Sequence, residues 1–539
     1  MTAADLVLVA DTVHTLTEAA RPVQAVAIAE GVVAAVGTRD DVRGWRGPRT
    51  EVVDLGGAVL TPGLTDGHMH PVMGLQMAVD VDLSGARSLD DVRRLLAAAA
   101  VGRGPEDWVQ GWGLDPNVFG GAPVTSAPIE AAVGRRPAFL RLFDAHSALA
   151  TERALAIAGV DGPRSFDMRS EVVCDDRGRP TGLLLEVGAM DLVTAHVPLD
   201  PVPVRAAQLR ELLNAMSAAG LTGGHVMDLL GDSRQVVAAA EGDGELPLRL
   251  RFAPWCLPGV DDDGLAELID LQGQGGRRWS IGGVKFMVDG TIDNGTAWLE
   301  HPDALGESTE SFWPDPEAYT AAVRALAAAG VPTATHAIGD AAVRHALDAL
   351  DGVPRGVAPH RVEHIETLPT PLIGRFLRQG VVASMQPTHC THFTRADHTD
   401  NWSARLGDER ADRAWRCRDL RDAGVPVVLG SDWPVAPFDP RRVMADAQLR
   451  RPAGEPDVPP VQPLQGLTPL MALQGYTTQA ADVAGESARA GRIAVGRRAD
   501  LTAFAVDPLR ADPDELADAP IALTVVDGAI VHRDTAGAG

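Results

Sequence analysis

Lysine is nearly absent from this chain, although arginine is abundant. The 48 basic residues are 47 arginines and one lysine, Lys285. An arginine, with a pKa above about 12, keeps its proton, whereas the amine of a lysine can lose one and add carbon dioxide to form a carbamate. A single remaining lysine can be a matter of chance, or it can indicate chemistry that a guanidinium cannot perform.

Cysteine, positive charge and long apolar runs are also scarce, and each absence excludes a class of protein. The four cysteines show no CxxC spacing, which argues against a disulfide framework or a thiolate zinc site and fits a reducing cytoplasm. With 48 basic against 73 acidic residues, the formal charge of -25 opposes a nucleic acid or an anionic membrane as a partner. No apolar run of about 20 residues is present, and the first residues do not resemble a signal peptide, so we expect a cytoplasmic protein without a membrane span.

The middle of the chain alternates short apolar runs with helical patterns, which predicts parallel strands joined by helices. Because eight such strands can be counted, we expect a (β/α)₈ TIM barrel. The expected strands cover 58–64, 137–143, 221–226, 283–288, 332–335, 361–362, 381–385 and 425–430. Helices with apolar spacing near 3.6 are expected at 89–100, 319–329, 341–350, 371–378 and 415–423.

Both chain ends consist of short β-like segments with almost no helical pattern. We therefore predict one small β-sandwich domain formed from residues 1–56 and 486–539, and a barrel domain from residues 57–485. Two inserts, near 72–135 and 387–412, interrupt the predicted barrel. Long excursions of this kind usually form lids or pocket walls.

The segment LTPGLTDGHMHP (60–71) places His68 and His70 two residues apart at the end of a predicted strand. Side chains at i and i+2 of a strand point to the same side, so both imidazoles can reach one metal ion. A lone HxH is a weak signal. Further ligand types, however, recur at the ends of later predicted strands, where the active sites of TIM barrels lie. These residues are Lys285, His336, His364 and Asp432. The alternative is a set of core histidines satisfied by hydrogen bonds.

In these and other motifs the chain resembles the amidohydrolase superfamily, and within it the branch of N-substituted formamide deformylases and exoenzyme-regulator-like proteins. The similar segments run along nearly the whole chain: TPGLTDGHMHP, RPTGLLLE, GGVKFMVDG, THAIGD, HRVEHIE, ASMQPTH, LGSDWPV and GRIAVGRRADL. The resemblance implies a TIM-barrel hydrolase in which one or two divalent ions, zinc first, are held by side chains at the strand ends. Carried over, these ligands are His68, His70, a carbamate on Lys285, His336, His364 and Asp432.

Simple electrostatics supports this ligand set. An anionic carbamate between two divalent ions would relieve their mutual repulsion. Imidazole and carboxylate ligands suit zinc, with iron and manganese as alternatives. A bound divalent ion lowers the pKa of water to about 7, and Asp432 would accept the proton and pass it to the leaving amine. The resemblance also suggests a homodimer, although no stretch of sequence shows an interface.

A second group of residues follows the other predicted strands and could contact substrate. For each of them a structural role is an open alternative: a polar pair for Asp144 and His146, and packing for the tryptophans. Arg361 and Glu363 flank His364 and could support the ligands from behind or be structural, and Asp228 could line the pocket or have a structural role. The candidate substrate contacts are Asp144, His146, Glu186, His225, Gln386, His389, Trp112 and Trp433.

The favoured function is hydrolysis of a C–N bond, in a linear amide or an N-substituted formamide of small size. A cyclic-amide hydrolase, a deaminase and a carbamate or ester hydrolase are alternatives, because one scaffold can host all of these reactions. A metal-bearing binding protein without turnover is a further alternative, which the complete ligand set disfavours.

Overall fold

The computed structural model describes residues 3–18, 22–242 and 244–534, and two parallel sheets form the centre of the fold. The first sheet, in the order β16-β15-β14-β7, consists of β7 (Leu64–Met69), β14 (Leu221–Val226), β15 (Arg249–Phe252) and β16 (Trp279–Ile281). The second, in the order β17-β18-β19-β20-β21, consists of β17 (Val284–Met287), β18 (Thr333–Ala337), β19 (Arg361–His364), β20 (Val382–Met385) and β21 (Val427–Leu429).

Isolated bridges connect the two sheets at two places. Met69 at the end of β7 pairs with Trp433, just beyond β21, and Trp255, just beyond β15, pairs with Lys285 of β17. The result is a TIM-barrel-like α/β fold in which the carboxyl ends of the strands come together. The expected α/β class is thus confirmed, although the strand ladder is not continuous between the two sheets.

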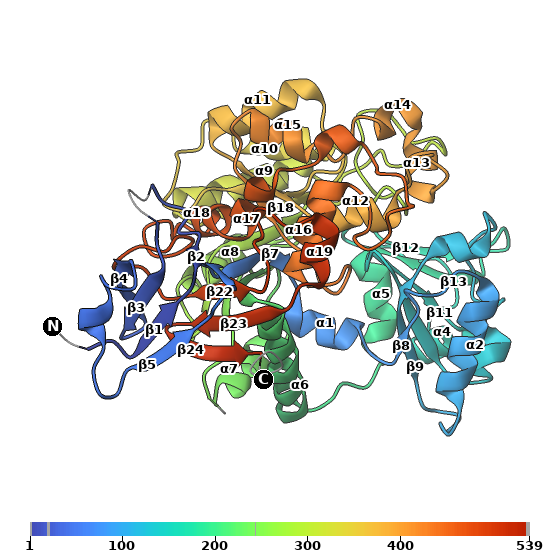
Figure 1. The fold of residues 1–539 in the computed structure, drawn as a ribbon. Helices are drawn as coiled ribbons and strands as arrows, with labels where there is room; N and C mark the ends of the chain where they lie inside the picture. The colour runs from blue at the N-terminus through green and yellow to red at the C-terminus, as the bar shows by residue number, and fades with distance from the viewer. Residues whose placement is uncertain (1–2, 19–21, 243, 535–539) are drawn as a thin grey trace.

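Helices from the connections pack around these strands and share one apolar core with them. In Figure 1, α9, α10, α11 and α15 lie together on one side of the strands. The helices between or after the strands are α6 (Val202–Ala218), α7 (Ser233–Gly242), α8 (Asp262–Asp270), α9 (Pro316–Ala328), α10 (Asp340–Ala349), α11 (Thr370–Gln379), α15 (Cys417–Asp422), α16 (Pro440–Leu449), α17 (Pro469–Tyr476) and α18 (Thr478–Val483). The five expected helices are all present, within a few residues of their predicted ends.

Local sequence explains where these helices begin and end. Asp315 caps α9 by accepting a hydrogen bond from the amide of Glu317, and Pro316 occupies the first turn, where its missing N–H costs nothing. Gly380 ends α11 in the left-handed conformation, with φ of 70°, which a glycine adopts without strain.

A six-stranded sheet follows β7 and α1 (Pro71–Met77) and forms the body of an insert, at the right of Figure 1. Its order is β12-β13-β11-β10-β9-β8. The strands are β8 (Val81–Asp82), β9 (Val109–Leu114), β10 (Ala138–Leu142), β11 (Ser147–Ala150), β12 (Glu171–Cys174) and β13 (Pro180–Leu185). The helices of this insert are α2 (Leu89–Ala100), α3 (Glu130–Val133), α4 (Glu152–Ile157) and α5 (Glu186–Thr194). The sheet therefore extends well past residue 135, where the sequence pattern placed the end of the insert.

The second insert consists of short helices, namely α12 (Pro387–Phe393), α13 (Asn401–Leu406) and α14 (Asp408–Ala411).

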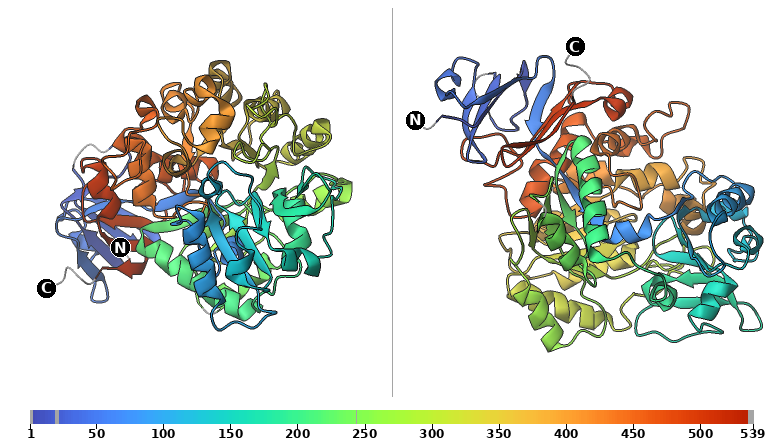
Figure 2. Two further views of the ribbon diagram at one scale, coloured as in Figure 1. Left: turned by 90° about the vertical axis from the view of Figure 1, so that its right-hand side faces the viewer. Right: turned by 90° about the horizontal axis from the view of Figure 1, so that it is seen from below.

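Two further sheets bring the chain ends together, as both views of Figure 2 show. Their apolar faces share one buried cluster, which includes Leu8, Ile28, Leu501 and Val525. The first sheet, β4-β3-β1-β5, contains β1 (Leu6–Val9), β3 (Ala25–Ala29), β4 (Val32–Gly37) and β5 (Glu51–Asp54). The second, β2-β6-β22-β23-β24, contains β2 (Thr12–Val13), β6 (Val59–Pro62), β22 (Leu501–Phe504), β23 (Ile521–Val526) and β24 (Ala529–Arg533), and α19 (Pro513–Asp518) follows β22.

Two of the eight expected barrel strands were assigned to the wrong sheet. The run 58–64 mainly forms β6, which pairs with β22, and the central strand is the next segment, β7, whose polar Asp66 and His68 hide its strand character. The run 137–143 forms β10 of the insert. Its two faces contact two separate apolar clusters, so its sequence is as apolar as that of a barrel strand.

Two central strands, β15 and β16, were not predicted at all. β15 reads RLRF, and its alternating arginines conceal a strand whose Leu250 and Phe252 are buried. Arg249 binds Asp527, from the turn between β23 and β24, which explains why a charged residue is accepted here.

Among the helices of the described segments, none combines the length and the apolar character that crossing a membrane requires.

Phe286 of β17 provides a test of the core. Its ring is fully buried and contacts Tyr319 edge-on, with 5.3 Å between ring centroids. We expect Phe286→Ala to lower the free energy of unfolding by about 3–5 kcal/mol, because a large cavity would remain. Leu464→Ala, at a side chain that is 89% exposed, should change it by less than about 0.5 kcal/mol. Denaturant titration of both variants without added metal measures this difference, and equal stabilities would contradict the packing described here.

Candidate metal centre

The ends of the central strands bring six predicted residues into one cavity. His68 and His70 come from β7 and the residue after it, Lys285 from β17, and Asp432 from the turn after β21. His336 and His364 lie on the neighbouring strands β18 and β19. All six are buried, and all six line a cavity of about 560 Å³. The structure thus assembles the residues that the strand-end pattern predicted.

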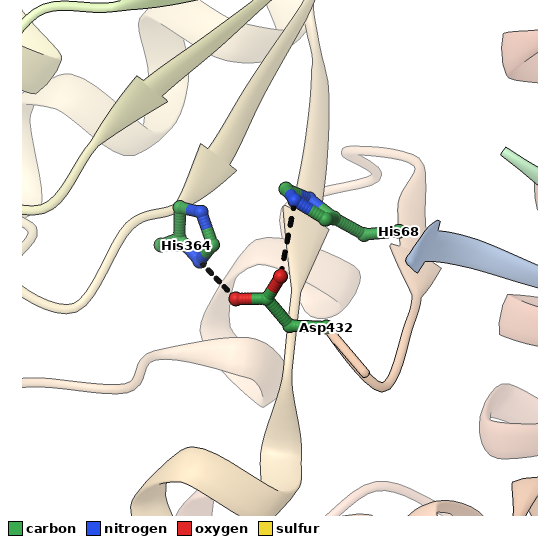
Figure 3. Close-up of side chains that lie close together, drawn as sticks. All are labelled: His68, His364 and Asp432. Atoms are coloured by element: carbon green, nitrogen blue, oxygen red, sulfur yellow. Dashed lines mark ion pairs between the residues drawn. The ribbon is translucent and has the colours of Figure 1, made fainter. Parts of the chain in front are cut away.

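The carboxylate of Asp432 lies at the centre of this group. Its Oδ1 is 3.2 Å from Nε2 of His70 and 3.4 Å from Nε2 of His68, and its Oδ2 is 3.9 Å from Nδ1 of His364. Figure 3 shows the two histidines, His68 and His364, facing the carboxylate from either side. Potential ligand atoms of His68, His364 and Asp432 all lie within 4.8 Å of one another.

Two carboxylates outside the cavity orient the paired histidines. Nδ1 of His68 lies 2.6 Å from Oε2 of Glu363, and Nδ1 of His70 lies 2.7 Å from Oδ2 of Asp228. These contacts engage Nδ1 of each ring, and Nε2 of each ring faces Oδ1 of Asp432. Nε2 of His68 is buried and has no hydrogen-bond partner among the described residues. An unsatisfied buried nitrogen in a group of imidazoles and carboxylates fits a divalent metal ion.

His336 and Lys285 complete the group. The His336 ring is 4.4 Å from that of His364, and its Nε2 lies 3.2 Å from the carbonyl oxygen of Gly290, so that its Nδ1 is the nitrogen left for a metal. The amine of Lys285 makes no hydrogen bond or ion pair with any residue that the structure describes, although the side chain is buried. Burial lowers the pKa of Lys285 to about 8, which gives a substantial fraction of neutral amine near neutral pH.

Charge is distributed unevenly over the centre. Burial alone would raise the pKa of Asp432, but the neighbouring His68 and His70 outweigh it and hold that pKa well below its usual range. Burial opposes a charged His70, yet the hydrogen bonds to Asp228 and Asp432 raise the pKa of His70 to about 9. In Glu363, burial is outweighed by Arg361 and His68, which lower the pKa of its carboxyl group.

Three candidate substrate contacts do border the cavity or support it. Asp144 and His146 line it directly. Nδ1 of His146 lies 2.8 Å from Oε2 of Glu186, the first residue of α5. Burial opposes charge on His146, but Glu186 raises its pKa to about 9. Asp144 accepts a hydrogen bond from Oγ1 of Thr291 at 3.0 Å.

His389 lies on a smaller side pocket that opens from the same centre. This pocket of about 40 Å³ also includes Asp432, His336 and Glu366 in its wall. Nε2 of His389 is 3.7 Å from Oδ2 of Asp432 and is otherwise unsatisfied within the described part of the chain. His389 therefore lies near one oxygen of Asp432, and His70 lies near the other.

The structure places the remaining candidates elsewhere. His225 lines a separate pocket with Arg251, and its Nδ1 lies 3.1 Å from Nη1 of Arg361, so it does not line the large cavity. Gln386, the residue before α12, is buried, and both polar atoms of its side chain are unsatisfied in the described structure. Trp433 packs against Gly74 and Phe438.

Trp112 is a half-buried residue of β9 in the insert sheet, and the cavity wall on that strand is instead formed by Gln110.

The insert was expected to form a lid or a pocket wall, and it does line the cavity, but sequence reasoning did not name several of the residues involved. Phe139 and Arg141 of β10, and Met190 and Asp191 of α5, all line the cavity. The apolar run of β10 was visible in the sequence, but its assignment to the barrel concealed this role.

Comparisons with known proteins place the chain in a family. A sequence model described as "Amidohydrolase family" matches residues 51–532. The chain belongs to the amidohydrolase family. The putative amidohydrolase YtcJ of Bacillus subtilis (strain 168) is 29% identical over 535 residues, which cover 97% of this chain and 98% of that protein. The N-substituted formamide deformylase of Arthrobacter pascens is 27% identical over 548 residues, with 98% and 99% covered.

The fold of this amidohydrolase is also found among solved structures. A crystal structure of an uncharacterized metal-dependent hydrolase from Pyrococcus horikoshii OT3 matches it with a TM-score of 0.72 at 23% identity, covering 94% of this chain and 99% of that one. The resemblance inferred from the motifs is confirmed, and the chain shares the fold of a metal-dependent hydrolase.

The pair formed by His70 and Asp228 provides a test of the centre. We expect Asp228→Asn to weaken zinc binding by about 10- to 100-fold, because the ring loses the negative partner that raises its basicity. Asp507→Asn is the matched control, since Asp507 makes an equally short contact of 2.7 Å with His14 outside the cavity. Competition with a chelator gives both affinities, and an unchanged affinity in Asp228→Asn would show that this pair does not support a metal ligand.

Proposed function

We propose that this amidohydrolase cleaves the C–N bond of a linear amide, and in particular of an N-substituted formamide, by metal-assisted attack of water. The observation that carries the proposal is the set of four histidines, one lysine and one aspartate on the wall of a single cavity. Similarity to an N-substituted formamide deformylase over almost the full length of both chains supports the formamide as first choice.

His68, His70, Lys285, His336, His364 and Asp432 would hold one or two divalent ions, of which zinc suits imidazole and carboxylate ligands best. Lys285 would act as its carbamate. Its amine would attack carbon dioxide, form a C–N bond and release one proton, which leaves a carboxylate-like anion at the end of a long side chain. A buried amine without a partner, with a pKa lowered to about 8, supports this role.

A divalent ion in this centre supplies water activated near neutral pH and polarisation of the substrate carbonyl group. Asp432, with its two oxygens directed at different histidines, would take a proton from water and deliver it to the departing nitrogen. His146, with its Nδ1 on Glu186, presents Nε2 to the cavity and would donate a hydrogen bond to the developing oxyanion.

The same centre could serve a cyclic amide, an aminated ring, a carbamate or an ester, and these substrates are the alternatives to test beside formamides. A small molecule is proposed as the sole partner of the site. In this proposal the barrel domain of residues 57–485 carries the reaction, and the β-sandwich of residues 1–56 and 486–539 carries no ligand.

Removal of metal should abolish hydrolysis. We expect chelated protein to lose formamide hydrolysis, and added zinc to restore it. Asp432→Asn should lower kcat by at least about 100-fold, since the proton carrier is lost. Asp90→Asn, at an exposed carboxylate of α2, should have no effect on kcat. Product amine is measured over a panel of formamides, cyclic amides, esters and aminated rings. Full activity after chelation, or turnover confined to another substrate class, would overturn the proposal.

A further inference from the structure

The large cavity has a wall that the hydrolytic centre does not use. Besides the strand ends, it is lined by α1, by α5 and by the insert strands β9 and β10. Most of this additional wall is apolar, for example Met77, Phe139, Met190 and Leu199. A substrate that filled this cavity of about 560 Å³ would contact the apolar wall as well as the metal centre at its scissile bond.

A positive charge without a hydrogen-bond acceptor or an ion-pair partner in the described residues lies in this apolar wall. Arg141 of β10 lines the cavity, and its Cζ lies 5.0 Å from the ring centroid of Phe139. No residue in the described segments accepts a hydrogen bond from its guanidinium group. Other arginines of the same insert do have acceptors: Arg103 binds Asp80, and Arg153 binds Glu106.

The surroundings of Arg141 make this lack of a partner costly. Burial lowers the pKa of Arg141 to about 10, and the guanidinium remains charged at neutral pH. Asp191 of α5 attracts it without forming an ion pair, and one oxygen of Asp191 already accepts a hydrogen bond from Thr194 at 3.2 Å. A half-buried guanidinium that lacks both a hydrogen-bond acceptor and full hydration binds an anion favourably, because the anion supplies the missing acceptor and charge.

A neutral donor lies on the same surface. Gln110 of β9 pairs directly with Phe139 of β10, and residues i and i+2 of a strand share a face. Gln110, Phe139 and Arg141 therefore line the cavity from one face of the insert sheet. The side-chain amide of Gln110, like the guanidinium, has no hydrogen-bond partner among the residues described.

We propose that Arg141, with Gln110 beside it, binds a carboxylate carried by the substrate away from the bond that is hydrolysed. This inference rests on the proposed hydrolytic function and narrows its substrate class to amides whose apolar body ends in a carboxylate. The apolar wall holds the body, Arg141 holds the anionic end, and the reacting amide reaches the centre at the strand ends.

Two matched formamides test this preference. N-formylaminohexanoate ends in a carboxylate, and N-formylaminohexanamide replaces it with a neutral amide of similar shape. For the wild-type protein, kcat/KM should be about 10- to 100-fold higher for the carboxylate than for the amide, mainly because KM is lower. A charge-assisted hydrogen bond has a binding free energy of this size. Arg141→Met should remove the preference, and Arg141→Lys should keep part of it. Arg94→Met removes an exposed charge from the same insert and should leave the preference intact.

A binding measurement separates this inference from the function on which it rests. Calorimetric binding of aminohexanoate and aminohexanamide is compared for wild type and Arg141→Met, after both are shown to have the same metal content and melting temperature. If wild type binds the carboxylate and Arg141→Met does not, the inference is supported, even where neither formamide is hydrolysed. A lack of hydrolysis of both formamides would overturn only the hydrolytic proposal. Equal kcat/KM for the two formamides, or carboxylate binding that persists in Arg141→Met, would overturn the role of Arg141.

Discussion

The centre depends on the interaction of the buried Asp432 carboxylate with the histidines around it. A carboxylate removed from water costs several kcal/mol unless opposite charge and hydrogen bonds compensate for it. Here His70 and His68 lie within 3.4 Å of one oxygen, and His364 and His389 face the other. The histidines in turn require orientation from outside, which Glu363 and Asp228 supply. A carboxylate behind the ring thus fixes the position of each of the paired histidines, His68 and His70.

The fold brings these groups together because β7 and β21 approach very closely. A Cβ atom added to Gly67 would lie 2.6 Å from the carbonyl oxygen of Leu429, and one added to Gly430 would lie 2.5 Å from the amide nitrogen of His68. Side chains at these two positions would separate the strand that carries the paired histidines from the strand that leads to Asp432. The insert sheet then covers the strand ends and extends the cavity beyond the centre.

The candidate ligands could be predicted because they lie at or just beyond the ends of strands, a pattern visible in the sequence at His68, His336 and Asp432. The arrangement of strands was harder to predict, because short apolar runs form wherever both faces of a sheet are covered. β10 is such a case, whereas β15 was hidden by Arg249 and Arg251. The position of His225 behind Arg361 depends on which side of the strand faces the cavity. The unpartnered state of Arg141 arises from tertiary packing alone, and no local pattern indicates it.

The most direct test of the account uses the single lysine of the chain. Since Lys285 is the sole ε-amine, a carbamate on any lysine must be on this residue. Protein equilibrated with isotopically labelled bicarbonate and zinc is examined by carbon NMR, beside Lys285→Arg, with metal content measured in both. We predict one carbamate signal per chain with about two zinc ions, and loss of both the signal and the metal in the variant. A wild-type protein without the signal, or a variant with unchanged metal content, would contradict a carbamate-dependent metal centre.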